Sequence, residues 1–459
     1  MKPKIGLLSI AHKDYTTDVS KGFVNLAIKN IENIGCEVIF NGMSITNSLN
    51  SQEEAKKISK LDIDCVIIFI ETWIDASVAM SAIRMIEHIP FLILGFPMFY
   101  NNSGKKDQTG SIVGYSVLKG SLDRLGYNYK SILGKIDDGN IINQVCSFVK
   151  AAHAYNRLKE SRVGLFGYVS MSMYPGNFDH LLLRKIIGPE VIHFDTYTLI
   201  ERIKNISDKE TAGVTDFLKE NFTISKHVTN KQLKIVSSMY LSLKDLIKEY
   251  SLNGLTIKCQ YELSQNYGMT ACIPLSLLSD DKIVSGCEGD MPTLISMLIF
   301  YYLSGDAIFY GDFLDFYEDN KVLFSSCGFA PFSLATKKKK SIIKNFIELE
   351  SVISKKDIDS KFDTFKGLVN SSTLKPGKIT FGRLVEKIGS YKFVCSTAAA
   401  FETELRQGIM PAMEAKLDCD TGNFLSNIAS QHFAICYGDI TDELRDLCTI
   451  LNIEFIKID

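Results

Sequence analysis

The chain has 459 residues, of which 46% are hydrophobic and 23% are charged, and its formal net charge is −2. This length predicts about two to four domains, each large enough to bury a core. The near-neutral charge gives no long-range attraction to nucleic acid or to an anionic membrane, so we expect neither as a partner. The short basic run Lys337–Lys340 is expected to be a solvated loop or a helix start.

The cysteines and the apolar runs indicate the compartment. Eleven cysteines are scattered without any CxxC spacing. The apolar run near the N-terminus is too short for the core of a signal peptide, and no run reaches the roughly 18 apolar residues of a membrane span. We therefore expect a cytoplasmic protein whose thiols are reduced.

The first 155 residues alternate between strand and helix patterns. Apolar strands are expected at residues 4–10, 36–42, 65–73 and 90–97, and helices at 19–35 and 51–62. The first helix is expected to end at Gly35, because glycine commonly terminates helices. Apolar strands separated by helices form parallel sheets that are covered on both faces. Residues 1–155 are therefore predicted to form a Rossmann-like α/β domain.

The alternation restarts after residue 155 and predicts a second α/β domain over residues 156–320. Strands are expected at 162–168, at the start of 190–199 and at 254–260, with helices at 178–188 and 231–254. Neither α/β domain carries a GxGxxG or GxxxxGK[ST] loop after a strand, which is the pattern that binds a pyrophosphate. We therefore expect no nucleotide cofactor.

The pattern changes again after residue 320. Strand-like segments at 321–328, 378–385, 391–398 and 432–438 are separated by turns rich in Gly, Pro and Lys. This pattern predicts a mostly antiparallel, barrel-like β domain over residues 321–459, with one helix and a short strand within 442–458. The expected fold class is thus two Rossmann-like parallel-sheet domains followed by a β-rich C-terminal domain.

Three residues in this frame are candidates for chemistry. Glu288 and Asp290 flank a glycine just before an apolar, helix-like run, where helix capping explains either carboxylate. Asp312 interrupts an aromatic strand, and a carboxylate there must face water or meet a partner. His432 begins a strand, where an isolated histidine is more often structural than a ligand. Two carboxylates and one imidazole suit a divalent ion such as Mn²⁺, but their spacing does not demonstrate a site.

The order of the motifs KCQ, CEGD, GD, SCG, QHF and GD resembles the L-fucose/L-arabinose isomerase superfamily, in particular L-fucose isomerases and their shorter relatives. The resemblance spans most of the chain. It implies that Glu288, Asp312 and His432 bind Mn²⁺ or another divalent cation, and that Asp290 is the helix cap. It also implies an enediol proton transfer with Glu288 and Asp312 as the acid–base pair, with the central domain carrying both carboxylates and the C-terminal domain carrying His432.

The resemblance extends to substrate-binding residues, each of which has an ordinary structural alternative. Gln260 matches a glutamine that binds sugar hydroxyls, although a polar residue at a strand end needs no such role. Trp73, the single tryptophan, resembles an aromatic residue that a neighbouring subunit offers to the sugar, and a core or surface role explains it equally well. Gln431 is expected to contact substrate or to face outward.

One position departs from the family pattern. Many shorter relatives have His-Cys-Gly where this chain has Ser326, Cys327 and Gly328. Serine cannot replace histidine as a metal ligand or a base, while L-fucose isomerases themselves carry Ser-Gly near this position. We expect Ser326 to contact substrate, and the change leaves the identity of the sugar open.

The leading hypothesis is a Mn²⁺-dependent aldose–ketose isomerase of carbohydrate metabolism that acts on an L-fucose- or L-arabinose-like monosaccharide. The resemblance also implies a homo-oligomer, either a trimer or a hexamer, with sites completed across subunits. A second hypothesis is a non-catalytic sugar-binding or regulatory protein on the same scaffold. A third is a metal-dependent enzyme of another reaction type, such as an epimerase, since fold does not fix function.

Overall fold

The computed structural model describes the chain apart from residues 1, 102, 338–340, 347–365, 406–407 and 409. Most of the basic run at 337–340 therefore lies outside the described residues. The chain divides into two compact units. Unit 1 comprises Met1–Arg157 and Asp442–Ile453, and unit 2 comprises Leu158–Thr441 and Glu454–Asp459. The finer division into three domains at residues 155 and 320 stays a prediction.

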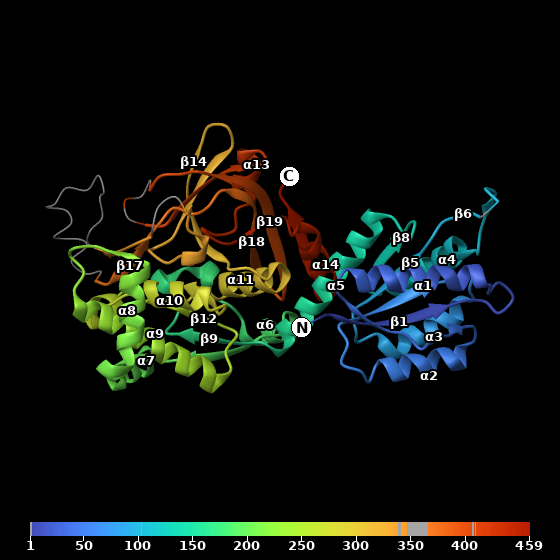
Figure 1. Cartoon of the computed structure of the whole chain (residues 1–459), viewed down its shortest axis with the longest axis horizontal. Helices are drawn as coiled ribbons and strands as arrows, with labels where there is room; N and C mark the ends of the chain where they lie inside the picture. Colours follow the sequence, from blue (N-terminus) through green and yellow to red (C-terminus); the bar gives the residue numbers. More distant parts are fainter. Residues whose placement is uncertain (1, 102, 338–340, 347–365, 406–407, 409) are drawn as a thin grey trace. The chain divides into compact units, whose positions relative to one another are not determined.

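Unit 1 is built on a parallel sheet in the strand order β2-β1-β4-β5-β8, with β3 also pairing with β1 (Figure 1). Its strands are β1 Lys4–Ile10, β2 Glu37–Ile39, β3 Ser44–Ile45, β4 Cys65–Ile70, β5 Phe91–Gly95 and β8 Lys130–Leu133, with a small hairpin of β6 Phe99–Tyr100 and β7 Lys106–Asp107. Its helices are α1 Asp18–Asn33, α2 Ser48–Ile58, α3 Ala76–Ile86, α4 Ser111–Leu125, α5 Gly139–Glu160 and most of α14 Thr441–Leu451.

The sheet of unit 1 is covered on both faces, as its apolar strands predict. Successive residues of a strand point to opposite faces, so Val66 and Ile68 of β4 enter one core and Ile67 and Phe69 enter the other. Residues from α2, α3 and α4 pack in the first core, and residues from α1 and α5 pack in the second. A strand buried on both faces must be apolar throughout, which is why residues 65–70 contain no polar side chain other than the thiol of Cys65.

Unit 2 contains a second parallel sheet in the order β10-β9-β12-β13. Its strands are β9 Arg162–Phe166, β10 Glu190–Phe194, β12 Gly254–Ile257 and β13 Val284–Cys287. The accompanying helices are α6 His180–Ile186, α7 Thr196–Asn205, α8 Asp208–Asn221, α9 Asn230–Tyr250, α10 Cys272–Asp280 and α11 Met291–Ser304, with a π-helical turn at Glu262–Tyr267. A small three-stranded sheet consists of β11 Thr223–Ile224, β16 Ile342–Asn345 and β17 Leu368–Ser371.

Unit 2 also contains a closed β-barrel. Six strands of the described chain run in the order β18-β21-β14-β15-β20-β19, and the antiparallel pairing of β18 with β19 closes the ring. The barrel strands are β14 Phe309–Tyr317, β15 Lys321–Ser325, β18 Gly377–Lys387, β19 Ser390–Phe401, β20 Ala412–Leu417 and β21 His432–Tyr437. Strand β22 Glu454–Lys457 pairs with β19, and helix α13 Thr421–Asn427 contributes Phe424 to the barrel core.

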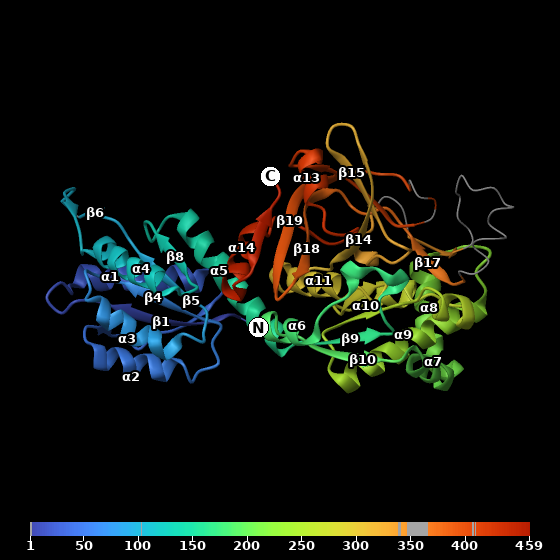
Figure 2. The ribbon, with the colours of Figure 1, turned by 180° about the vertical axis from the view of Figure 1, so that it is seen from behind.

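Helix α11 joins the parallel sheet of unit 2 to the barrel. It packs against β12 and β13 of the sheet and against β18 and β21 of the barrel, and both views show it between these two layers (Figures 1 and 2). Every residue from Met291 to Phe300 is buried, as an apolar helix with two covered faces requires. The segment just before this helix therefore lies where sheet and barrel meet.

The predicted fold class is confirmed, with parallel α/β sheets and a closed antiparallel barrel. Asp312, which the sequence analysis placed in a central α/β domain, lies on the barrel strand β14. The helix expected after residue 442 is present as α14, but it packs in unit 1. Among the described helices, none combines the length and the apolar character that a membrane crossing requires.

Candidate active site

The predicted site lies at the carboxyl ends of two neighbouring strands of the unit 2 sheet. Strands β12 and β13 run parallel, so their carboxyl ends meet at the same edge. Gln260 follows β12 and Glu288 follows β13 directly, and Nε2 of Gln260 donates a hydrogen bond of 2.7 Å to Oε1 of Glu288. Ligands of open α/β sheets bind outside this edge, which makes it the expected place for a site.

The backbone at Glu288 adopts a conformation that is unusual for a residue with a side chain. Glu288 has φ of +62° and Gly289 has φ of +68°. A Cβ atom at Gly289 would lie 2.3 Å from the carbonyl oxygen of Tyr168, so only glycine fits there. Non-glycine residues held in this left-handed region are enriched at functional sites, because the surrounding structure must hold them there.

Asp290 is the N-cap of α11, as the resemblance implied. Its Oδ1 accepts a hydrogen bond of 2.9 Å from the backbone N–H of Thr293, which satisfies one of the free donors at the helix start. The left-handed turn at Glu288 and Gly289 thus separates two carboxylates that are close in sequence. Asp290 serves the helix, and Glu288 is directed toward the barrel.

The barrel brings Asp312 and His432 together by strand register. The two residues are directly opposite each other on the antiparallel strands β14 and β21, so their side chains share a face. Nε2 of His432 lies 2.9 Å from Oδ1 of Asp312 and 3.4 Å from Oε2 of Glu288. The structure therefore brings the three predicted metal ligands together around one imidazole nitrogen, although they lie on three separate segments.

The other nitrogen of His432 is held by residues that the sequence analysis did not assign to the site. Nδ1 lies 2.8 Å from Oδ2 of Asp290 and 2.7 Å from the hydroxyl of Tyr310. Asp290 in turn forms a buried ion pair with Arg383, at 3.0 Å. A charged residue in the otherwise uncharged run Ile379–Val385 was the one available signal for Arg383. The carboxylate fixes Nδ1 as a donor and directs Nε2 at Glu288 and Asp312.

The pKa values of the carboxyl groups differ according to their surroundings. Burial raises the pKa of Glu288, but contact with His432 and Cys327 outweighs it, and the pKa lies below its ordinary value. Burial also raises the pKa of Asp312, and here contact with His432 does not offset it, so that pKa stays above its ordinary value. For Asp290 the positive charges of Arg383 and His432 overcome burial and hold the pKa well below the usual range.

His432 itself is held between carboxylates. Burial alone lowers the pKa of an imidazole, because it disfavours the charged form. Contacts with Asp290, Asp312 and Glu288 outweigh burial and raise the pKa of His432 well above its ordinary value. The pocket around this side chain therefore stabilises positive charge.

The two oxygens of Glu288 have different surroundings. Oε1 accepts the hydrogen bond from Gln260 and a second one, at 2.9 Å, from the thiol of Cys327. Gln260 is fixed in turn by Ser170, whose hydroxyl donates to its Oε1 at 2.9 Å. Oε2 is buried and accepts no hydrogen bond from any described residue. Among the described residues this buried oxygen has the 3.4 Å ion-pair contact with His432 but no hydrogen bond, and a bound cation would compensate for its lost hydration.

Two further residues were predicted to contact substrate, Ser326 and Gln431. The Ser326 hydroxyl is directed at its own turn, and Gln431 lies beside His432. Ser326 is buried, and its hydroxyl bonds the backbone of its own turn at Gly328 and Phe329. Gln431 is partly buried, and its Nε2 lies 2.8 Å from Sδ of Met173 and 3.3 Å from Nε2 of His432. Their roles toward a sugar stay predictions.

Trp73 belongs to unit 1, whereas the other predicted site residues belong to unit 2. It is partly buried and meets the rings of His12 and Tyr15 edge-on, at centroid distances of 5.4 Å and 6.2 Å. Gly110 packs against it, since a Cβ there would lie 2.9 Å from Cβ of Trp73. The structure thus shows an aromatic cluster at the carboxyl end of β4, and the role of Trp73 toward a sugar stays a prediction.

A cavity of about 580 Å³ in unit 2 borders the Asp290–Arg383 ion pair. It is lined by Arg383, Glu386 and the segment around Tyr174 to Asp179. Glu288, Asp312 and His432 are not among its lining residues, so the cavity lies beside the candidate site and does not include the three predicted metal ligands.

Comparisons with known proteins place the chain near sugar isomerases, although no protein-family model matches it. It is 22% identical over 363 residues to a sulfoquinovose isomerase of Alkalicoccus urumqiensis, covering 78% of each chain. It is 20% identical over 378 residues to a sulfoquinovose isomerase of Priestia aryabhattai, covering 81% of each chain. A solved solute-binding protein from Agrobacterium vitis, matched at 12% identity with a TM-score of 0.17, is too dissimilar to support an argument. The relatives indicate an enzyme, an aldose–ketose isomerase, and they fit the superfamily that the sequence resembles without identifying a particular member.

Proposed function

We propose that the chain is a Mn²⁺-dependent aldose–ketose isomerase in which Glu288 and Asp312 move a proton between C1 and C2 of an open-chain sugar. The observation that supports this most strongly is the grouping of two carboxylates around Nε2 of His432, with Oε2 of Glu288 buried and without a hydrogen bond. The isomerase relatives support the reaction class.

The residues at the site fit a divalent cation. Glu288, Asp290 and Asp312 carry three negative charges when ionised, and Arg383 compensates one of them. A divalent cation would neutralise the remaining two without requiring a proton on His432. Carboxylate oxygens and an imidazole nitrogen are donors that Mn²⁺ accepts. Glu288, Asp312 and His432 would hold the ion, which when bound supplies Lewis-acid stabilisation of charge on the sugar oxygens.

The two carboxyl groups have environments that suit opposite roles. The lowered pKa of Glu288 keeps it ionised and able to accept a proton. Burial raises the pKa of Asp312 above its ordinary value, so this carboxyl group holds a proton more readily than an exposed aspartate does. A pair of titratable groups whose pKa values are displaced in opposite directions is typical of an acid–base pair. Asp290 and Tyr310 position His432, and Gln260 positions Glu288.

For the substrate, we infer a free aldose, and the names of the relatives make sulfoquinovose the first sugar to test. Lys258 and Arg383, two buried cations near the site, are each paired with a carboxylate, Glu262 and Asp290 respectively. Binding of a sulfonate by either cation would compete with that pairing. Neutral L-fucose- and L-arabinose-like aldoses are therefore the second arm of the panel.

The proposed function is tested by incubating the manganese-loaded enzyme with each sugar in deuterated water and following deuterium at C1 and C2 by nuclear magnetic resonance. We expect exchange and ketose formation with at least one sugar, and a loss of about 10³-fold or more in Glu288→Gln and Asp312→Asn. The matched control is Asp315→Asn, an exposed carboxylate on the same strand as Asp312, which should retain full activity.

The same experiment separates the alternatives. A sugar that binds without exchange or ketose formation would favour the sugar-binding or regulatory protein. Exchange at a carbon other than C1 or C2 would favour an epimerase. Full activity in both Glu288→Gln and Asp312→Asn would contradict the assigned acid–base pair.

A further inference from the structure

Four cysteines meet beside Glu288, although they come from four separate segments of unit 2. Cys259 follows β12, Cys272 begins α10, Cys287 ends β13 and Cys327 follows β15. Sγ of Cys272 lies 3.9 Å from the carbonyl oxygen of Cys327, and the four thiols are close enough to shift one another's pKa. The sequence shows no paired cysteine spacing, so only the fold reveals this cluster.

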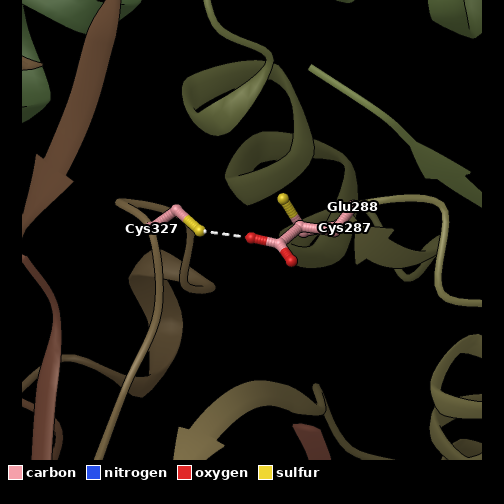
Figure 3. A group of neighbouring side chains, drawn as sticks. All are labelled: Cys287, Glu288 and Cys327. Atoms are coloured by element: carbon pink, nitrogen blue, oxygen red, sulfur yellow. Dashed lines mark hydrogen bonds between the residues drawn. The ribbon is translucent and has the colours of Figure 1, made fainter. Parts of the chain in front are cut away.

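The end of this thiol cluster reaches Glu288. One donor atom each from Cys287, Glu288 and Cys327 lies within 4.8 Å of the others (Figure 3). Sγ of Cys327 points at the carboxylate and lies 2.9 Å from Oε1. Ligand atoms that share one tetrahedral zinc ion are about 3.5–4 Å apart, given metal–sulfur bonds of about 2.3 Å. The three side chains therefore need to move little to share an ion.

Glu288 thus lies between two kinds of metal ligand, with thiols on one side and a carboxylate and an imidazole on the other. Thiolates prefer soft or borderline ions such as Zn²⁺ and Cd²⁺, whereas Asp312 and His432 on the other side of Glu288 also accept harder ions. Glu288 is 3% exposed, and its Oε2 has no hydrogen-bond partner among the described residues. That buried oxygen has only the 3.4 Å ion-pair contact with His432 among the described residues, which is a second indication that the carboxylate is arranged for a cation.

We propose that Cys287, Cys327 and Glu288 form a binding site for a thiophilic divalent cation, and that this ion withdraws Glu288 from Asp312 and His432. On binding, the S–H bond of each thiol breaks, a sulfur–metal bond forms, and the two protons pass to solvent. Inhibition of isomerisation by Zn²⁺ is the expected consequence and rests on the proposed function. Cation binding itself does not depend on it.

Cd²⁺ is the probe, because cadmium–thiolate bonds absorb in the ultraviolet. The reduced, metal-free full chain is titrated with Cd²⁺ while absorbance and proton release are recorded. We expect one absorbing ion per chain and about two protons released for each ion bound. Cys287→Ser and Cys327→Ser should each lose at least about half of the absorbance, since each removes one of two sulfur ligands.

Cys146→Ser is the matched control, because Cys146 and Cys327 are the two partly exposed cysteines of the chain. It should behave like the wild type. Circular dichroism of each variant checks folding. Cys327→Ala is a second variant, which removes the sulfur without placing a hydroxyl group next to Glu288. No thiolate absorbance in the wild type, or equal absorbance in Cys287→Ser, Cys327→Ser and the wild type, would overturn the proposal.

A second readout separates this proposal from the proposed function. If the enzyme isomerises a sugar, Zn²⁺ should inhibit the wild type and Cys146→Ser at least about 10-fold more strongly than Cys327→Ser. Equal inhibition of all three would place Zn²⁺ at the Asp312–His432 side and contradict the shared-carboxylate arrangement. If no sugar reacts but the cadmium absorbance behaves as expected, the proposed function fails and the thiol site stands.

Discussion

At the scale of single residues, Asp290 has more tasks than its position in the sequence suggests. Its carboxylate caps α11, forms a buried ion pair with Arg383 and contacts Nδ1 of His432. Helix capping is a sufficient explanation for an aspartate before a helix, so the sequence pattern did not predict the contacts of Asp290 with Arg383 and His432. The partner, Arg383, lies 93 residues away in sequence, and only the closure of the barrel brings it to the helix start.

The buried ion pair predicts a large stability effect. In Arg383→Met, Asp290 loses its compensating charge in a buried position, and we expect the free energy of unfolding to fall by about 3–5 kcal/mol. Urea unfolding measures the change. The control is Lys387→Ala on the same strand, whose pair with Glu454 is about half exposed and should contribute no more than about 1 kcal/mol. Equal effects of both substitutions would contradict the account of Asp290.

Gly289 allows a second prediction at this scale. Gly289→Ala adds both an unfavourable φ and a clash with the carbonyl of Tyr168, whereas Gly305→Ala adds only the unfavourable φ, because nothing lies near its Cβ position. The φ effect alone is about 1–2 kcal/mol. We expect Gly289→Ala to lower the free energy of unfolding by clearly more than Gly305→Ala and to weaken Mn²⁺ binding. If the two variants lose the same free energy and Mn²⁺ affinity is unchanged, the tight turn does not position Glu288.

At the scale of elements, helix α14 shows where pattern reading reaches its limit. The apolar patterns predicted a helix within residues 442–458 and strands at 4–10 and 65–73, and the structure has these elements at Thr441–Leu451, Lys4–Ile10 and Cys65–Ile70. Which sheet the helix covers was not predictable, since an apolar face does not specify its partner. The structure places α14 in unit 1, where Asp446 accepts hydrogen bonds of 2.6 Å from Lys130 and Ser147.

This contact predicts a pH-dependent effect. Burial raises the pKa of Asp446, and Lys130 opposes that rise only in part. In Lys130→Met the pKa should rise further, so that the folded state disfavours the carboxylate more strongly. The penalty is absent below the unfolded carboxyl pKa of about 3.9 and grows as pH rises through the folded pKa. We expect a destabilisation of about 3 kcal/mol at neutral pH that shrinks toward pH 4.

Urea unfolding of Lys130→Met and the wild type across this pH range measures the effect. Lys119→Met is the control, since its pair with Asp123 is about half exposed. A destabilisation of Lys130→Met that does not change with pH would show that lost packing, and not the charge of Asp446, is responsible.

At the scale of the whole molecule, the strand and helix patterns predicted the fold class and the resemblance supplied the candidate ligands, but neither revealed the network around them. Glu288, Asp312 and His432 were named from motifs, and the structure brings them together. Cys327 was noted only as part of the Ser326–Gly328 motif, yet its thiol contacts Glu288 while the Ser326 hydroxyl bonds its own turn. Long-range contacts of this kind depend on chain closure and leave no local pattern in the sequence.

The predicted homo-oligomer gives a test of Trp73 at this scale. Suppose that Trp73 of one subunit completes the site that contains His432 of its neighbour. In an oligomer mixed from Trp73→Ala and His432→Ala chains, some sites then combine the native His432 of one chain with the native Trp73 of the other. Random assembly of equal amounts makes about a quarter of the sites intact. Co-expressed, differently tagged chains should therefore recover activity well above either parent. Recovery no greater than the mean of the parents would contradict a shared site.

The most direct test of the account is Mn²⁺ binding by titration calorimetry on the metal-stripped protein. Wild type is compared with His432→Ala and with His227→Ala, which removes an exposed histidine elsewhere in unit 2. We expect one ion per chain for the wild type and His227→Ala, and at least about 100-fold weaker binding for His432→Ala. Equal binding by all three proteins, or none by the wild type, would contradict a metal site at Glu288, Asp312 and His432.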